Sequence, residues 1–264
     1  MKKMKRFVFA AAVFSACAAL PAAFVGCSGS AEIIYTLSGD GTHYSVSGVG
    51  GTKTSLKNAE IPATYSDGVS AELPVTEIGE SAFRGCYNLS SVTLPQGIER
   101  IGDLAFASCA FMEFTIPDTV KEIGFSAFAL CRTLKSIVIP ESVTDLGDRA
   151  FYGCSSLTVA DVKANITELK YSTFYNTVIT SAGNLYKQTA LKTVYLPATL
   201  TKVHVTALQG NILSDVYFAG TSGQWQNVVF YDTRKKEGTE DEYEEVKYDK
   251  EEVLGTAQLH FAES

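Results

Sequence analysis

The stretch from Leu73 to Val162 repeats one phrase four times, and this repeat constrains the fold more than any other feature. An Ala-Phe pair marks each copy, and successive phenylalanines are 23, 22 and 23 residues apart. Phenylalanine, glycine and cysteine keep the same step: Phe83, Phe106, Phe128, Phe151; Gly79, Gly102, Gly124, Gly147; Cys86, Cys109, Cys131, Cys154. A fixed period of this length is typical of a solenoid, whose coils bury their apolar faces by stacking on one another.

The apolar positions within one copy predict the path of a coil. Val120 and Ile123 are expected to point inward from a short extended segment, and Gly124 to permit a sharp bend. Phe128 then fills the interior, and residues 136–139 alternate as a strand with one buried face. We therefore predict a mainly β, right-handed solenoid of 22–23-residue coils with a parallel sheet and short turns or helical segments. The phenylalanines, with Phe174 in a fifth copy, are assigned to the core.

Less regular segments flank the repeats. Residues 33–60 contain two β-prone runs around Gly39-Asp40-Gly41, which predicts an amino-terminal β-hairpin cap on the solenoid of residues 61–230. After Val162 the phrase weakens, and residues 178–190 are expected to form a shortened coil.

The pattern then returns, with Leu208 in the phenylalanine position and His204 in the glycine position. Trp225 is expected to pack on the end of the array as a cap. Residues 231–264 are predicted to form a charged loop and a capping strand in a carboxy-terminal hairpin, with the acids between Asp232 and Glu252 facing solvent.

The amino terminus has the form of an export signal. A basic start and an apolar run ending in small residues occupy residues 1–26, and the end of that run resembles the bacterial lipobox. Cys27 is the predicted lipidation site, with Cys17 as a second candidate and an ordinary cleaved secretory signal as the alternative. Residues 27–32 would then be a flexible tether, and two lipid chains would anchor the protein to the cell envelope.

The repeats resemble the BspA-type leucine-rich repeats of bacterial and protozoan surface proteins, through the pattern IPxxVxxIGxxAFxxCxxLxxVxIP over about residues 61–230. The closing VYFAGTSGQW also resembles an ending common in that family. The resemblance implies a right-handed solenoid with a parallel sheet on its concave side and, often, adhesion to macromolecules of a host or a neighbouring cell. It implies no catalytic residues and no cofactor.

Charge narrows the range of partners. The net charge is −7, and without the four basic residues of the first 26 it is −11. A chain without a basic patch has no electrostatic footprint for nucleic acid, and an anionic membrane surface would repel it. Membrane attachment would therefore depend on the lipid anchor.

Four regularly spaced cysteines in an exported protein raise the questions of disulfides and of zinc. One cysteine per coil, with coils about 4.8 Å apart, spreads the four thiols over roughly 14 Å, which is too far for one tetrahedral site. Equivalent side chains on stacked coils also point in parallel rather than at each other. Buried free thiols are the favoured interpretation, with adjacent-coil disulfides left open.

Nothing in the sequence indicates an enzyme. The histidines His43, His204 and His260 lie in different segments, none beside a nucleophile motif, and His204 is expected on the convex surface. The acids of residues 232–252 lack the spacing of an EF-hand. No catalytic, cofactor or metal residue is assigned.

Strand residues that point away from the core are the predicted ligand face. They are Ser91, Thr93, Glu113, Thr115, Ser136, Val138, Val159, Asp161, Thr193, Tyr195, Asp215 and Tyr217. The predicted function is that of a surface-exposed, monomeric lipoprotein that binds a protein or glycan on a host or neighbouring cell. Two alternatives stay open: a carbohydrate- or mucin-binding module that uses Tyr195, Tyr217 and Trp225 as stacking platforms, and an envelope protein without a dedicated ligand.

Overall fold

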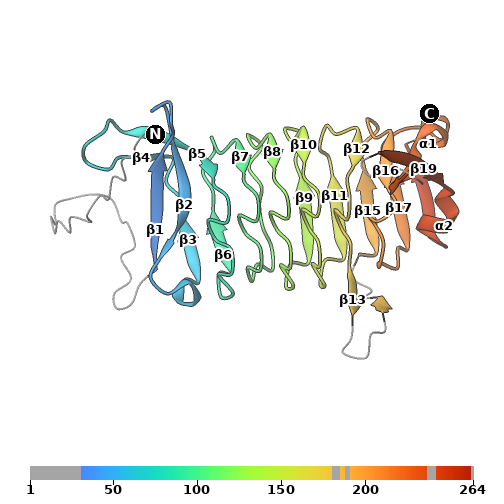
Figure 1. The fold of residues 1–264 in the computed structure, drawn as a ribbon, viewed down its shortest axis with the longest axis horizontal. Coiled ribbons are helices and arrows are strands. Elements are labelled where there is room, and N and C mark those ends of the chain that lie inside the picture. The colour runs from blue at the N-terminus through green and yellow to red at the C-terminus, as the bar shows by residue number, and fades with distance from the viewer. Residues whose placement is uncertain (1–30, 180–184, 188–190, 237–241, 263–264) are drawn as a thin grey trace.

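The computed structural model describes residues 31–179, 185–187, 191–236 and 242–262. They form an elongated stack of coils, with the amino-terminal strands at one end and the carboxy-terminal helices at the other (Figure 1). The export signal, Cys17 and Cys27 lie outside the described residues. Within the described part of the chain, no helix is long and apolar enough to span a bilayer.

Two rows of short strands run along the stack. The first row begins with β1 (Glu32–Leu37) and β2 (Tyr44–Gly50), an antiparallel hairpin, and continues in parallel. Its further strands are β5 (Leu73–Ile78), β7 (Arg100–Ile101), β8 (Glu122–Ile123) and β10 (Asp145–Leu146), with β4 (Thr64–Tyr65) antiparallel on β5. A separate four-stranded sheet has the order β12 (Glu168–Leu169), β16 (Lys202–His204), β18 (Val229–Lys235), β19 (Tyr243–Tyr248).

The second row contains the predicted ligand strands. A five-stranded, all-parallel sheet has the order β20 (Gln258–Phe261), β17 (Asp215–Phe218), β15 (Thr193–Leu196), β11 (Val159–Val162), β9 (Ser136–Ile139). Nearer the amino terminus, β3 (Asn58–Glu60) pairs in parallel with β6 (Ser91–Thr93), and a 3-10 turn (Lys53–Ser55) precedes β3. The solenoid of parallel strands with a hairpin at each end confirms the predicted fold class.

Between the two rows, each of the four regular coils turns through two residues in the left-handed region, and the next coil keeps the first of them. The first set comprises Ser81, Leu104, Ser126, Arg149 and Ser172, and the second comprises Gly85, Ser108, Leu130 and Gly153. The Ala-Phe pair lies between them, and its backbone bonds to the next coil, as from Phe106 N to Ala127 O at 2.8 Å and from Phe128 N to Ala150 O at 2.8 Å. Inter-coil hydrogen bonds therefore compensate the backbone strain of the turn.

The repeated glycines permit close backbone approach rather than the bend predicted for Gly124. Gly124 does not have a left-handed φ. A Cβ atom on Gly147 would lie 2.5 Å from the carbonyl carbon of Gly124, and one on Gly124 would lie 2.8 Å from that of Gly102. The coils therefore stack backbone on backbone here, and only glycine leaves the room.

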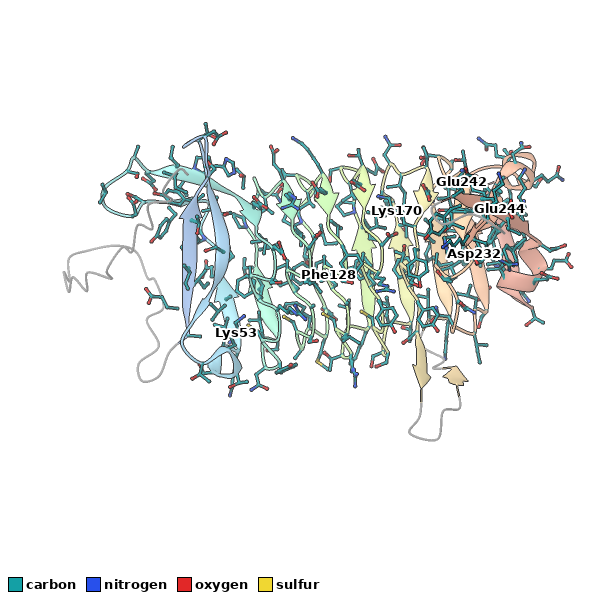
Figure 2. All side chains as sticks on the ribbon, in the orientation of Figure 1. Lys53, Phe128, Lys170, Asp232, Glu242 and Glu244 are labelled. Atoms are coloured by element: carbon teal, nitrogen blue, oxygen red, sulfur yellow. The ribbon has the colours of Figure 1, made fainter. Side chains whose placement is uncertain are left out.

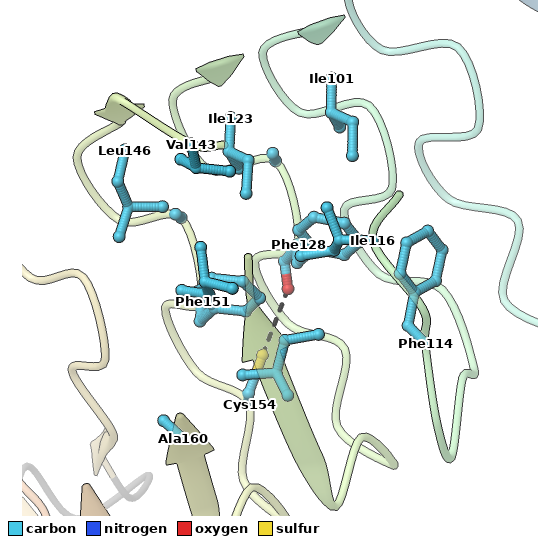
Figure 3. Packing of buried hydrophobic residues seen from close by; sticks show 14 of the residues in the cluster. Ile101, Phe114, Ile116, Ile123, Phe128, Val143, Leu146, Phe151, Cys154 and Ala160 are labelled. Carbon is cyan, nitrogen blue, oxygen red and sulfur yellow. Dashed lines mark hydrogen bonds between the residues drawn. The ribbon is translucent and has the colours of Figure 1, made fainter. Parts of the chain in front are cut away.

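The phenylalanine ladder forms the centre of the core. Phe83, Phe106, Phe128, Phe151 and Phe174 are each at most 2% exposed, and successive ring centroids are 5.2 to 5.4 Å apart in stacked geometry. Figure 3 shows Phe128 and Phe151 among the aliphatic side chains that close the coil around them. Each buried ring contributes roughly 1.5–3 kcal/mol by transfer from water.

The coil that contains Cys109 is one residue shorter than its neighbours, and the sheet is interrupted there. Cys109 is followed after two positions by the buried Phe111, whereas the other cysteines are followed after three by leucine. Residues 113–116 consequently form no strand, although Phe114 packs between the rings of Phe106 and Phe128 at 5.0 and 4.8 Å. The single missing residue thus separates β6 from β9.

The prediction of a shortened coil at residues 178–190 is wrong. β13 (Thr177–Ile179) and β14 (Leu185–Lys187) pair with each other in antiparallel register, and β13 projects from the side of the stack (Figure 1). β11 pairs directly with β15, Val159 opposite Thr193, so one coil takes 34 residues instead of 23. β13 and β14 thus pair with each other and do not form a layer of the solenoid.

The carboxy-terminal end is closed by apolar packing. Trp225 of α1 (Ser222–Asn227) is 5% exposed and contacts the rings of Phe218, Phe230 and Phe261, as expected of a cap. Lys250 of α2 (Lys250–Leu254) donates from Nζ to the Trp225 carbonyl at 2.6 Å.

The acids of the charged segment lie outside this packing. Asp232, Glu242 and Glu244 are at the carboxy-terminal end of the stack, in or beside the β18–β19 hairpin (Figure 2). Glu242 and Glu244 are exposed there, whereas Asp232 is half-buried beside His204.

Candidate ligand-binding face

The outer face of the five-stranded sheet brings most of the predicted ligand residues together in two rows. β9, β11, β15 and β17 alternate buried residues with exposed or half-buried ones, whereas the edge strand β20 has no buried residue. The register places Ser136, Val159, Thr193 and Asp215 in one row and Val138, Asp161, Tyr195 and Tyr217 in the other. Glu113 and Thr115 are exposed on the interrupted coil beside β9, while Ser91 and Thr93 lie on β6 beyond it.

An aromatic ladder occupies the carboxy-terminal part of this face. The rings of Tyr195 and Tyr217 stack at 4.6 Å, and the imidazole of His260 stacks on Tyr217 at 4.2 Å. His260 Nε2 lies 2.8 Å from Asp215 Oδ1, which fixes the ring against the neighbouring strand. His260 is absent from the sequence prediction because the pairing of β20 with β17 crosses more than 40 residues.

Two adjoining grooves run along the face. One, of about 480 Å³, is mainly apolar and is lined at its centre by Tyr195, Leu196, Tyr217, Phe218 and Phe261. The other, of about 630 Å³, lies over the interrupted coil and contains Glu113, Asp118 and Ser136. Glu141 and Lys163 line both grooves, so the two share a wall.

The charge at the outward positions is acidic. Glu60 on β3, Glu113, Asp161 and Asp215 are all acidic, and no lysine or arginine occupies an outward position of β3, β6, β9, β11, β15, β17 or β20. Lys163, just after β11, lies 3.7 Å from Asp161. The face is therefore negative with an aromatic end.

The four repeat cysteines belong to the core and not to this face. All are buried and free, and the thiol of Cys131 donates to the carbonyl of Phe106 at 3.2 Å, as does that of Cys154 to Phe128 at 3.2 Å (Figure 3). Burial raises the pKa of Cys131 to about 12 and that of Cys154 well above its usual range. Neither thiol ionises near neutral pH, so neither is a nucleophile.

His204 is not the surface residue that the sequence predicted. Its side chain is 3% exposed, lies between the rings of Tyr171 and Tyr231, and places Nε2 3.3 Å from Asp232. Burial lowers the pKa of His204, against the opposing effect of the nearby carboxylates. Where glycine packs backbone on backbone in earlier coils, the last coils leave room for an imidazole.

The side chains that could bind a metal ion are dispersed in the described part of the chain. His43, His204 and His260 lie far apart along the chain, and no group of three or more possible metal ligands gathers in the part that the structure describes. The predicted role of Trp225 as a stacking platform is also wrong, because its ring is buried in the cap.

Comparisons with known proteins agree with the geometry. The family model described as the BspA type leucine rich repeat region matches residues 53–180 in six copies. A leucine-rich repeat protein from Bacteroides ovatus has a similar structure, with a TM-score of 0.52 and 26% identity over 72% of this chain and 55% of that one. A comparison with curated protein sequences found no match.

The pneumococcal vaccine antigen PcpA shares the fold, with a TM-score of 0.52 and 20% identity over 72% of this chain and 50% of that one. The chain thus spans about half of the length of both proteins. The family model covers the same fourfold phrase that builds the phenylalanine ladder and the glycine column. The chain thus contains a BspA-type leucine-rich-repeat region over residues 53–180.

Proposed function

We propose that this chain is an exported lipoprotein, anchored through Cys27, that binds another macromolecule, in first place a protein, on the outer face of its five-stranded sheet. The observation that carries the proposal is the exposed Tyr195–Tyr217–His260 ladder beside an apolar groove. Partly exposed tyrosines on a rigid sheet are frequent anchors of protein interfaces, since they bury a large area at a small entropic cost.

The family supports the same class of function. Leucine-rich-repeat solenoids present extended surfaces for interaction, and catalysis is not their usual role. The proposed function needs no catalytic group, and the core thiols and His204 are buried.

The ring geometry favours a protein partner over a glycan. A sugar stacks on the open face of an aromatic ring, but Tyr195 and Tyr217 are nearly parallel, at 15°, and cover each other's faces. His260 covers the second face of Tyr217, so the edge and the hydroxyl group of that ring are what remains accessible. A protein partner uses such edges through apolar contacts and hydrogen bonds.

Binding of the purified full-length chain to a panel of matrix proteins and to a glycan array tests this function. The variant Tyr217→Ala should lower the affinity for a protein partner at least tenfold, whereas Tyr87→Ala, which removes a tyrosine that is 65% exposed but lines neither groove, should leave it unchanged. Binding of a glycan that depends on Tyr195 would favour the carbohydrate alternative. No binding to either panel would favour the structural one.

The anchor is tested separately. Growth with an alkyne-labelled fatty acid should label the wild-type chain and the Cys17→Ala variant but not the Cys27→Ala variant. Label retained in Cys27→Ala would overturn the assignment of the lipidation site, and export without any label would favour an ordinary secretory signal.

A further inference from the structure

We propose that the part of the partner that enters the two grooves is an extended, cationic peptide segment carrying one large apolar side chain. This inference rests on the proposed function and specifies the chemistry of the partner. It requires three properties of the face: unpaired negative charge, a length suited to a short peptide, and an apolar end.

The negative charge of the face is largely uncompensated. Among the described residues, Glu113, Asp118 and Glu141 have no basic side chain within ion-pair distance, and these three acids line the polar groove. Asp161 has only Lys163, at 3.7 Å. Carboxylates gathered on one face repel each other, and a cationic partner relieves that repulsion while it speeds association.

The same charge argues against a second copy of the chain as the occupant. The whole chain carries a net charge of −7, and the outward strand positions contain acids but no lysine or arginine. Two such faces would repel each other. The face would also repel a nucleic acid or an anionic lipid headgroup. The complementary chemistry is lysine and arginine.

The dimensions suit a short peptide laid across the strands. Parallel strands are about 4.8 Å apart, so four steps from β17 to the interrupted coil at Glu113 cover roughly 19 Å. An extended peptide rises about 3.3 Å per residue, and therefore about six residues span both grooves. The shared wall of Glu141 and Lys163 makes the path continuous.

The apolar groove accounts for the other half of the specificity. Tyr195, Tyr217 and Phe261 are partly exposed around a space of about 480 Å³, which is enough for one large apolar side chain. A small polycation such as spermine would satisfy the carboxylates but leave this groove empty. The pairing of an apolar pocket with neighbouring acids therefore points to a peptide.

Fluorescence anisotropy of the full-length chain with a labelled ten-residue peptide tests the inference. The peptide contains one tryptophan followed by three lysines, separated by glycine and serine, and two matched probes carry Lys→Glu or Trp→Gly replacements. We expect binding that weakens as salt rises, no binding of the Glu probe, and weaker binding of the Gly probe.

Charge variants locate the binding. The double variant Glu141→Gln, Asp161→Asn should weaken the binding of the lysine peptide about 3- to 10-fold, the range expected for exposed charge pairs. The control Glu80→Gln, Glu251→Gln, which removes two exposed acids outside both grooves, should not change it. Unchanged binding by the first variant overturns the inference, as does equal binding of the Glu probe or of the Gly probe.

The outcomes separate this inference from the proposed function. A macromolecular partner that is lost on Tyr217→Ala, together with no binding of the lysine peptide, leaves the binding function standing and overturns the cationic-segment assignment. Full displacement of the lysine peptide by spermine, with equal affinity for the Gly probe, also overturns it.

Discussion

Successive coils stack through different contacts in two parts of the molecule: the regular coils between Gly79 and Cys154, and the irregular coils after Val162. In the regular part the glycine column brings backbones into contact, the phenylalanine rings stack, and each cysteine from Cys109 onward donates its thiol to the phenylalanine carbonyl of the preceding coil. Every layer repeats the layer before it, and almost all of its distinctive residues are inside.

The irregular part replaces these contacts one by one. His204 fills the glycine position with a buried ring, and Leu208 fills the phenylalanine position. Asn211 stands three residues after Leu208, where cysteine is expected, and its amide donates to the carbonyl of Phe174 at 2.7 Å, as the thiols do elsewhere. Equivalent positions in the irregular coils thus keep their place in the stack, while the side chains that occupy them change.

The binding features lie mainly on the irregular side. The aromatic ladder extends over β15, β17 and β20, all of which follow β13 and β14 in the chain, whereas the outward residues of β6 and β9 in the regular coils include no aromatic side chain. Strict repetition yields a scaffold, and departures from it provide the residues that distinguish one surface from another.

The largest expected effect breaks the regular stack at its centre. Phe128 contacts the rings of Phe106, Phe114 and Phe151, and Phe128→Ala should lower the free energy of unfolding by about 3–5 kcal/mol. The control Phe125→Ala, which truncates a ring that is 40% exposed in the same coil, should cost about 1 kcal/mol or less. Urea unfolding followed by circular dichroism measures both. Equal losses would contradict the assignment of the ladder as the main stabiliser.

A smaller effect tests backbone contact in the glycine column. A Cβ atom on Gly147 would meet the backbone of Gly124 at 2.5 Å, so Gly147→Ala should destabilise the fold by about 1–3 kcal/mol through overpacking. Gly48→Ala is the matched change, because a Cβ atom at Gly48 meets nothing within 4 Å. The same unfolding assay applies, and a neutral Gly147→Ala would show that the regular coils can separate as the later ones do.

The sequence predicts the regular part well and the irregular part poorly, for a physical reason. The repeat of Phe128 and Cys131 specifies stacking because equivalent residues must meet their own kind in the next coil. No such rule predicts that β13 and β14 pair with each other rather than with the neighbouring coils, or that His204 is buried. His260 stacks on Tyr217 because β20 pairs with β17, although the residues of the cap lie between these strands in the sequence. No local pattern predicts that contact.

On the outer face, too, some features can be predicted from the sequence and others cannot. Alternation along each strand is local, so Tyr195 and Tyr217 were identifiable as outward residues that stack. The grooves were not, because one arises from a single missing residue after Cys109 and the other from the walls contributed by Pro197 and Phe261. A groove depends on several coils together, and hence on the packing rather than on the pattern.

A further prediction concerns the thiols of the regular coils. Cys131→Ala removes a buried sulfur and its bond to the Phe106 carbonyl and should cost about 1 kcal/mol. In the wild-type chain, an alkylating reagent at pH 7.5 should modify none of the four buried cysteines until denaturant is added, since burial suppresses their thiolates. Mass spectrometry counts the adducts; four thiols that stay unmodified in denaturant would indicate disulfides instead.

The smallest expected effect lies in the irregular part and depends on pH. Because burial lowers the pKa of His204 below its ordinary 6.5, the unfolded chain takes up the proton first as the pH falls. His204 therefore contributes to stability above pH 6.5, and this contribution is lost progressively below it. Unfolding midpoints between pH 7.5 and 5 should decline more steeply for the wild type than for His204→Gln, which keeps a polar side chain without the titration. Parallel pH profiles would mean that Asp232, Asp148 and Glu168 offset the burial, and that the irregular coils tolerate a charge where the regular ones admit only glycine.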